Sequence, residues 1–173
     1  MKMKDVIRRA MMARLPSCQE WNTLMDVVGK SRDAAHWAGA FSWGQDADPC
    51  FPPNRVILGC YTPRYFSSRN TSYQHKVLGF RPVFDALDHA VPDGAVVRIG
   101  TLYMDGQPVK IPEHPAWDGD IADYVTGARL EIREALGESA YQIQAIKAGG
   151  ALISDRVLIR NVSWADLEAN GFC

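Results

Sequence analysis

Two glycine-containing turns place the strongest constraint on the fold of this chain. Asp105-Gly106 and Gly149-Gly150 each lie between two stretches of alternating or β-branched residues. Glycine readily adopts positive φ, so such a pair between two extended segments is a strong signal for a tight β-hairpin. The predicted hairpin strands are 101–104 with 107–111, and 141–148 with 151–159. The second half of the chain is therefore expected to be largely β.

Helix signals lie near the two ends of the chain. Residues 4–14 carry apolar side chains at helical spacing, and Pro16 is predicted to end that helix. Ser17-Cys-Gln-Glu20 has the pattern of a capping box, in which the Ser hydroxyl and the Glu carboxylate satisfy free amides. The apolar residues that follow at helical spacing are Trp21, Leu24, Met25 and Val28, with Gly29 as the predicted end. A short terminal helix is predicted to start at Ser163 and close at Gly171.

The middle of the chain suggests a boundary between two parts. Segments 55–58 and 77–84 are predicted strands, while 128–136 fits a strand or a helix equally well. The turn-forming cluster 90–94 is the best candidate linker. Residues 1–90 hold 12 Lys and Arg against 8 Asp and Glu, and residues 91–173 hold 7 against 12. We therefore expect a domain over 1–90 and a small β-rich domain over 91–173 that ends in a helix.

Composition excludes several classes of protein. With 47% hydrophobic and 23% charged residues, the chain has an ordinary globular composition rather than that of a disordered or fibrous protein. No run of 18 apolar residues is present, and the charged amino terminus does not resemble a secretory signal. A cytoplasmic location without membrane association is expected. The net charge of −1 does not indicate nucleic-acid binding.

Cysteine and histidine spacing gives no metal or disulfide framework. The four cysteines include no Cys-x-x-Cys pair, and the histidines fall in no metal-ligand spacing. Asp118-Gly-Asp120-x-x-Asp123 lacks the twelve-residue calcium loop and is interpreted as an acidic turn. Glu131, Glu134 and Glu138 are interpreted as solubilising charges. We expect no metal and no cofactor.

Three segments resemble a known family in the same order. Arg14-Leu-Pro-Ser-Cys-Gln-Glu-Trp21 resembles an Arg-Leu-Pro-Thr-x-x-Glu-Trp segment of the formylglycine-generating-enzyme (sulfatase-modifying factor) family. Phe41-Ser-Trp43-Gly44 is similar to its Tyr-Pro-Trp-Gly motif, and Arg55–Gly59 followed by Leu78–Val83 is similar to its Arg-Val-x-x-Gly-Gly-Ser-Trp and Gly-Phe-Arg segments. The resemblance, over about residues 14–84, implies an α+β fold with a trimmed C-type-lectin-like domain. It also implies a structural ion pair for Arg81.

The catalytic members of that family suggest an oxidase, which the residues here do not support. The resemblance places the family's two copper-binding cysteines near Pro63 and near Ser67-Ser68, where this chain has no thiol. Cys60 alone cannot supply a two-thiolate site, and the histidine pattern of iron-dependent relatives is missing. A divergent metal or thiol oxidase, with Cys60 as nucleophile and His75 as its base, remains an alternative.

A second branch of the same fold fits the composition of residues 59–75 better. Variable proteins of diversity-generating retroelements are similar in carrying a Tyr-, Asn- and Ser-rich ligand surface just before a Gly-Phe-Arg-like strand. Tyr supplies rigid contact area at low entropic cost, and Ser and Asn supply adaptable hydrogen bonds. The expected ligand-binding residues are Tyr61, Arg64, Tyr65, Phe66, Ser68, Arg69, Asn70, Tyr73 and His75, with Trp43 as an additional contact.

The sequence therefore predicts non-catalytic recognition of a protein or other macromolecule through residues 59–75. The second alternative, a phage- or mobile-element-encoded inhibitor of a host complex, would use the same surface or the acidic second half of the chain.

Overall fold

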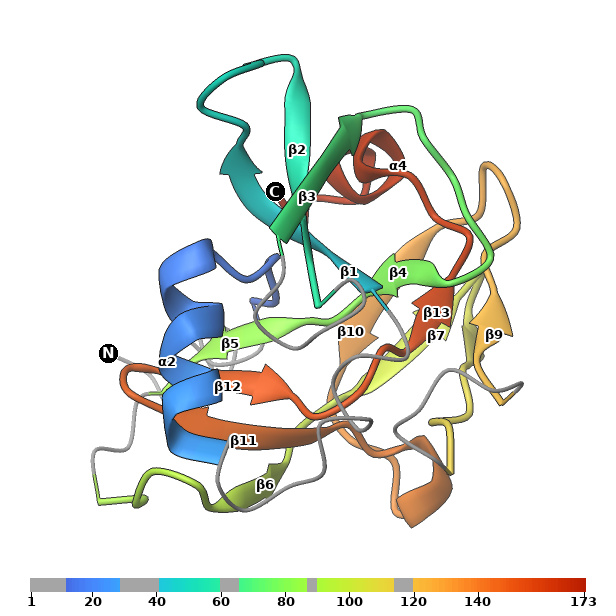
Figure 1. Ribbon diagram of the computed structural model, residues 1–173. Coiled ribbons are helices and arrows are strands. Elements are labelled where there is room, and N and C mark those ends of the chain that lie inside the picture. The colour runs from blue at the N-terminus through green and yellow to red at the C-terminus, as the bar shows by residue number, and fades with distance from the viewer. Residues whose placement is uncertain (1–11, 29–40, 60–65, 87–89, 114–119) are drawn as a thin grey trace, which may run out of the picture.

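The computed structural model describes residues 12–28, 41–59, 66–86, 90–113 and 120–173 (Figure 1). This part of the chain is mixed α+β and mostly sheet, with two α-helices and one turn of 3-10 helix. The helices are α2 (Cys18–Val28), α4 (Trp164–Ala169) and the 3-10 turn Ser139–Tyr141. The strands are β1 (Phe41–Ala47), β2 (Asn54–Leu58), β3 (Phe66–Asn70), β4 (Leu78–Phe80), β5 (Val83–Asp85), β6 (Val96–Arg98), β7 (Thr101–Met104), β8 (Gln107–Pro108), β9 (Ala122–Asp123), β10 (Leu130–Arg133), β11 (Gln144–Ala148), β12 (Ala151–Ser154) and β13 (Ile159–Arg160).

These strands form three sheets that mix the two halves of the chain. The six-stranded sheet has the order β3-β2-β1-β4-β13-β9, the four-stranded sheet β5-β12-β11-β6, and the three-stranded sheet β10-β7-β8. The first two sheets each contain strands from both sides of residue 90. The largest group of buried apolar side chains also draws on both sides. The boundary expected near residue 90 therefore does not coincide with a division of the sheets or of the core.

Both predicted hairpins are present. Asp105 and Gly106 have φ of 51° and 77° between β7 and β8, and Gly149 has φ of 58° between β11 and β12. The second hairpin is shorter than predicted, because the chain leaves it after Ser154 and enters the six-stranded sheet as β13. Likewise the expected strand 77–84 is interrupted at Arg81-Pro82, which separates β4 from β5 and sends them to different sheets. The ambiguous segment 128–136 contains β10.

The capping box that starts α2 is formed as predicted. The Glu20 amide donates to Ser17 Oγ at 3.1 Å, and the Ser17 amide donates to a Glu20 carboxylate oxygen at 3.0 Å. The four apolar residues expected on one face of this helix are all buried. Arg14 adds a contact that the sequence pattern does not predict, because its guanidinium donates to both Glu20 oxygens at 2.6 and 2.7 Å.

Residues 12–14 are not helical, although the sequence pattern predicts a helix over 4–14. Arg14 forms an antiparallel bridge with Val83, and the Leu15 amide donates to the Phe172 carbonyl at 3.0 Å. Residues 1–11 of the predicted first helix lie outside the described part of the chain. The segment that leads into α2 therefore connects β5 with the last residues of the chain.

Glu20 makes the stability of this region depend on pH. Burial by itself would raise the pKa of Glu20, but hydrogen bonds from Arg14 and Ser17 outweigh it and hold the pKa below its ordinary value. Because the folded-state pKa is depressed, the stabilisation is present above the unfolded-state value of 4.5 and is lost as the pH falls through the folded-state value.

We expect Glu20→Gln to lower the free energy of unfolding by about 1 kcal/mol near pH 7, with the difference from wild type shrinking towards about pH 3. Urea titrations at both pH values measure this. Glu134→Gln, which removes an exposed carboxylate, serves as the control. An equal deficit for Glu20→Gln at both pH values would contradict the assigned role of its charge.

Arg81 occupies a structural position in the interior. Its guanidinium lies 5.1 Å from the centroid of the Trp21 ring and donates to the Ser154 carbonyl at 3.0 Å. Burial lowers the pKa of Arg81 to about 10, while the charge of Asp155 acts in the opposite direction. Arg81 therefore joins α2, the turn between β4 and β5, and the end of β12.

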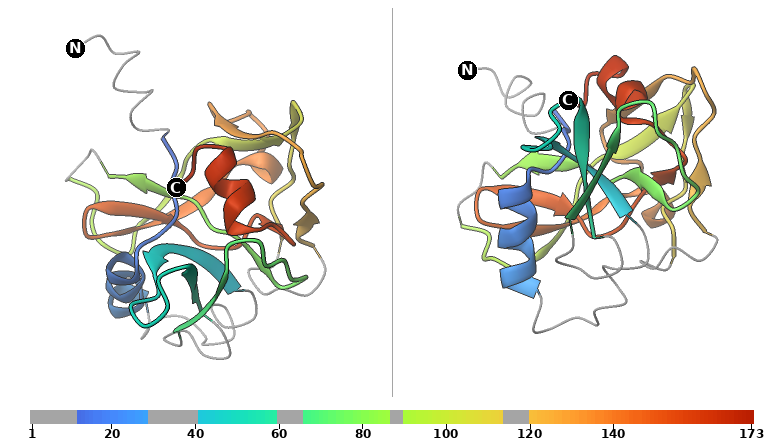
Figure 2. Two further views of the ribbon diagram at one scale, coloured as in Figure 1. Left: turned by 90° about the horizontal axis from the view of Figure 1, so that it is seen from above. Right: turned by 45° about the horizontal axis from the view of Figure 1, so that its top comes forward.

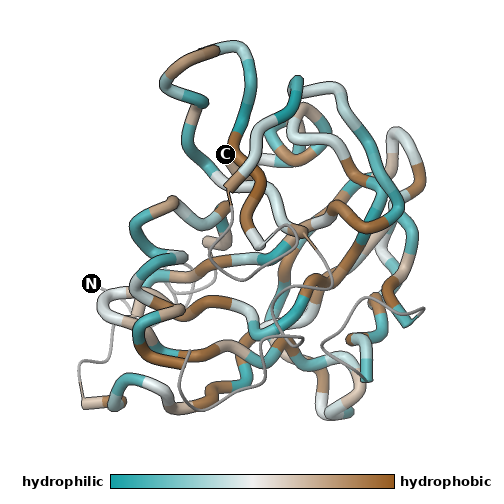
Figure 3. The backbone as a smooth tube through the Cα atoms, viewed as in Figure 1, coloured by the Kyte–Doolittle hydropathy of each residue, from teal (hydrophilic) through white to brown (hydrophobic). Residues whose placement is uncertain are grey.

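Within the described residues, no helix is both long and apolar enough to span a membrane. Hydrophobic residues gather on the strands that cross the interior, whereas β3 carries mainly polar residues (Figure 3).

The terminal helix α4 starts with the predicted cap, since the Asp166 amide donates to Ser163 Oγ at 3.1 Å.

Candidate recognition surface

Strand β3 carries the described centre of the predicted surface. It pairs antiparallel with β2 over five residues and forms one edge of the six-stranded sheet. Figures 1 and 2 show β3 at the surface of the molecule. Successive side chains of a strand point to opposite faces. Ser67 and Arg69 therefore share one face of the sheet, and Phe66, Ser68 and Asn70 share the other.

The face with Arg69 forms a stack of planar side chains. The Arg69 guanidinium carbon lies 5.6 Å from the centroid of the Tyr73 ring. The Tyr73 and His75 rings are stacked with their centroids 6.2 Å apart and their planes 6° from parallel. All three side chains are exposed. The arrangement offers a cation and two aromatic faces side by side.

A small cavity of about 120 Å³ accompanies this stack. It is lined by Phe41, Ile57, Ser67, Arg69, Tyr73, His75 and Leu78. Arg69 donates to Ser67 Oγ at 3.0 Å and to the Ser68 carbonyl at 2.7 Å, which holds its guanidinium at the rim. An apolar floor with a cation and aromatic rings at its edge fits a contact with one or two side chains of a partner.

The turn after β3 holds the stack in place. Asn70 Oδ1 accepts from the Ser72 amide at 2.9 Å and from Ser72 Oγ at 2.8 Å, and the Tyr73 amide donates to the Asn70 carbonyl at 3.0 Å. The Ala165 amide of α4 donates to the Thr71 carbonyl at 3.0 Å. These bonds fix the backbone between Arg69 and Tyr73. The surface therefore has much of its shape before any partner binds.

On the opposite face, Ser68 connects β3 to the turn between β1 and β2. Its hydroxyl donates to Asp48 Oδ2, and Asp48 Oδ1 accepts from the Cys50 amide at 2.8 Å. The hydrogen bond from Ser68 is the main cause that lowers the pKa of Asp48. Ser68 is thus a structural tie between two elements, whereas Phe66 on the same face is 38% exposed.

The segment of chain that carries this surface has charged residues of one sign, although Asp166 of α4 accepts from its Gln74 at 3.4 Å. Between Asp48 and Asp85 the chain contains Arg55, Arg64, Arg69, Lys76 and Arg81, and no Asp or Glu. Arg81 is buried, and Arg55 lies over the Trp164 ring with 4.5 Å between its guanidinium carbon and the ring centroid. Arg69 and Lys76 are exposed.

The structure brings together part of the predicted site and corrects one member. Arg69, Tyr73 and His75 form the stack, while Phe66, Ser68 and Asn70 belong to the opposite face or to the turn. Tyr61, Arg64 and Tyr65 lie outside the described residues, as does Cys60 of the thiol hypothesis. Trp43 does not belong to the surface. Its side chain is fully buried and donates from Nε1 to the Val162 carbonyl at 2.8 Å.

Sequence reasoning missed four of the seven residues that line the cavity, namely Phe41, Ile57, Ser67 and Leu78. Ser67 could have been assigned from the alternation along β3, because it points to the same side as Arg69. Phe41 could not, since its position follows from the pairing of β1 with β4, which joins segments more than 30 residues apart. A long-range pairing of this kind leaves no local signal in the sequence.

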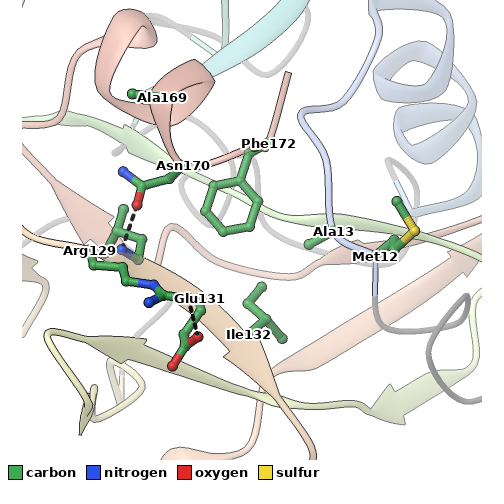
Figure 4. A pocket seen from close by; sticks show the side chains of 10 residues that line it. Met12, Ala13, Arg129, Glu131, Ile132, Ala169, Asn170 and Phe172 are labelled. Carbon is green, nitrogen blue, oxygen red and sulfur yellow. Dashed lines mark hydrogen bonds and ion pairs between the residues drawn. The ribbon is translucent and has the colours of Figure 1, made fainter.

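A larger cavity of about 470 Å³ lies beside the end of α4 (Figure 4). Its polar groups already satisfy one another: Asn170 Oδ1 accepts from the Leu130 amide at 2.7 Å, and Arg129 pairs with Glu131 at 3.5 Å.

Among the described residues, no group of three or more His, Cys, Asp or Glu side chains could hold a metal ion. Asp123 of the acidic run pairs with Arg160 at 2.9 Å.

Comparisons of the chain with protein-family models, with curated proteins and with solved structures find no match.

Proposed function

We propose that this protein is a non-catalytic recognition module that binds a macromolecular partner through the face of Ser67, Arg69, Tyr73 and His75. The observation that carries the proposal is the exposed Arg69–Tyr73–His75 stack, held by a hydrogen-bonded turn at the edge of a sheet. We refer to these four residues as the stack surface.

The composition of the stack surface suits binding more than catalysis. Tyr and Arg are, with Trp, the residue types enriched among interface positions with large energetic effects, because each buries a large planar area. Tyr has two side-chain torsions to freeze, and Ser adapts its hydroxyl to either a donor or an acceptor. Pre-ordering by the Asn70 turn reduces the entropy lost on binding. The stack surface is therefore equipped to bind at modest conformational cost.

We also propose that residues 12–86 have a trimmed form of the C-type-lectin-like fold of the formylglycine-generating-enzyme family. Its support is that the three resembling segments are neighbours. Strand β1, with Phe41–Gly44, pairs with β2 on one side and with β4 on the other. The Trp21 ring lies against the Arg81 guanidinium, which links the first segment to the last.

Removal of the stack is expected to abolish partner binding without unfolding the protein. Arg69 and Tyr73 are exposed, so the double variant Arg69→Ala/Tyr73→Ala should keep the wild-type thermal midpoint. If each side chain contributes about 2 kcal/mol, affinity for the partner falls roughly a thousandfold. The measurement is affinity capture from a bacterial lysate, followed by titration of the captured component with wild type and variant.

The matched control removes the same residue types from another part of the structure. Arg98 is exposed on β6 and Tyr141 is half-buried in the 3-10 turn, and neither belongs to the six-stranded sheet. Arg98→Ala/Tyr141→Ala should capture the same component as wild type. Equal capture by Arg69→Ala/Tyr73→Ala and wild type would show that the stack surface is not the binding site.

A further inference from the structure

We propose, on the basis of the recognition function above, that the partner contributes an extended acidic polypeptide segment, which adds a strand to the free edge of β3. The inference rests on two independent observations: the character of this edge and the charge of the side chains beside it.

The edge of β3 is the longest in the described part of the structure. The three sheets end in β3 and β9, in β5 and β6, and in β8 and β10. Strand β3 has five residues, whereas the other five edge strands have two to four. Proteins usually blunt their edges with short strands, bulges, proline or charged side chains. Strand β9 has two residues and β8 contains Pro108, whereas β3 has five residues, no proline and no bulge, and carries one charged side chain, Arg69.

The pairing of β3 leaves its outer side available to a polypeptide. Its register with β2 is continuous from Asn54↔Asn70 to Leu58↔Phe66, without a bulge. Within the described residues, β2 is the only strand that pairs with it. In an antiparallel strand, every second residue directs its N–H and C=O groups away from its partner. Those groups match the backbone of an added strand, the mode by which many modules bind extended peptides.

Charge selects an acidic occupant. Arg69 projects from β3 itself, Lys76 follows shortly after, and the chain has no carboxylate between Asp48 and Asp85. Asp166 of α4 accepts from Gln74 Nε2 at 3.4 Å, but its carboxylate is already engaged by the Ser163 hydroxyl at 2.6 Å. Asp48 is engaged by Ser68 on the opposite face of the sheet. A Glu or Asp in the added strand, on the side of the Arg69–Tyr73 stack, could pair with the guanidinium. Nucleic acid would supply negative charge but no N–H and C=O groups spaced to match the edge, so a polypeptide is favoured.

The test uses four fluorescent probes and measures anisotropy at low salt. The first is a peptide of about ten residues with alternating Thr and Glu, and the second replaces every Glu by Gln. The third is the acidic peptide with all its backbone nitrogens methylated, so that neither of its edges can donate. The fourth is an oligothymidine of about ten nucleotides. We expect the first to bind, the second and third to bind with an affinity lower by about tenfold or more, and the fourth not to bind.

Two variants connect the result to β3. Arg69→Glu should lower the affinity for the acidic peptide by about tenfold or more, because the attraction to its carboxylates is replaced by repulsion. Arg129→Glu makes the same charge change next to β10, which is also an edge strand, and should bind as wild type does.

Three outcomes would overturn the inference: no binding of the acidic peptide, equal binding of the methylated peptide, or tighter binding of oligothymidine. Its failure is distinguishable from failure of the recognition function. If Arg69→Ala/Tyr73→Ala loses the captured lysate component while the acidic peptide does not compete with that component, the stack surface remains the binding site. In that case only the acidic, strand-adding partner is excluded.

Discussion

Gly79→Ala is expected to cost at least about 4 kcal/mol of folding free energy, and so to leave little folded protein. Gly79 lies in β4 opposite Ser42 of β1 and Arg160 of β13. A Cβ atom at this position would lie 1.9 Å from the Ile159 carbonyl oxygen and 2.5 Å from Val157 Cγ1. The oxygen is part of the backbone of β13, so it cannot turn away as a side chain would. The two strands would have to separate, with loss of their hydrogen bonds.

Circular dichroism with urea titration measures this effect, and Gly137→Ala provides the control. A Cβ atom on Gly137 would meet no atom within 4 Å, and the residue has no positive φ. Alanine there should therefore change the free energy of unfolding by less than about 0.5 kcal/mol. Similar unfolding midpoints for the two variants would refute the close approach of β4 and β13.

Asp155→Ala is expected to lower the free energy of unfolding by about 3–5 kcal/mol, the second largest effect that we predict. Asp155 is 2% exposed and accepts from Nε and Nη2 of Arg156, both at 2.8 Å. Its charge also favours the protonated form of buried Arg81. Alanine would leave two buried guanidinium groups without the carboxylate that compensates them, and burial of an uncompensated charge is costly.

Two further variants separate charge from volume in this prediction. Asp155→Ala/Arg156→Met removes both partners and should recover part of the loss, although the hydrogen bond from Arg156 to the Pro112 carbonyl at 2.6 Å is also removed. Asp123→Ala breaks the pair with Arg160, in which the aspartate side chain is 61% exposed, and should cost no more than about 1 kcal/mol. If Asp155→Ala unfolds at the same urea concentration as Asp123→Ala, the buried pair does not have the proposed role.

The parts of the fold that the sequence predicts are those with local causes. A capping box places its two hydrogen-bonding partners three residues apart, so Ser17 with Glu20 and Ser163 with Asp166 can be recognised from spacing alone. The Asp105-Gly106 turn is equally local. The separation of β4 from β5 is not predictable in this way. Pro82 lies between the two strands, but no local signal shows that they join different sheets.

The sequence predicts the composition of the candidate site but not its geometry. The Tyr, Arg, Ser and Asn content of residues 59–75 does not reveal which side chains share a face. The alternation of β3 separates Arg69 from Ser68, and the Asn70 turn brings Tyr73 back to Arg69. The prediction for Trp43 is wrong because an aromatic residue near a polar segment resembles a binding residue, whereas its Nε1 partner, Val162, is 119 residues away.

The hydrogen bond from Leu15 to Phe172 also has a consequence for how the protein acquires its structure. The first described segment and the last are held together, and β13 inserts between β4 and β9 only after about 80 further residues have followed β4. Contacts that span most of a chain slow folding, because a large loop must close before they form. During synthesis, β1, β2 and β4 would emerge with one side of their sheet still unpaired. The nascent chain would thus expose two sheet edges, one at β4 and one at β3, until β13 has been synthesised and pairs with β4.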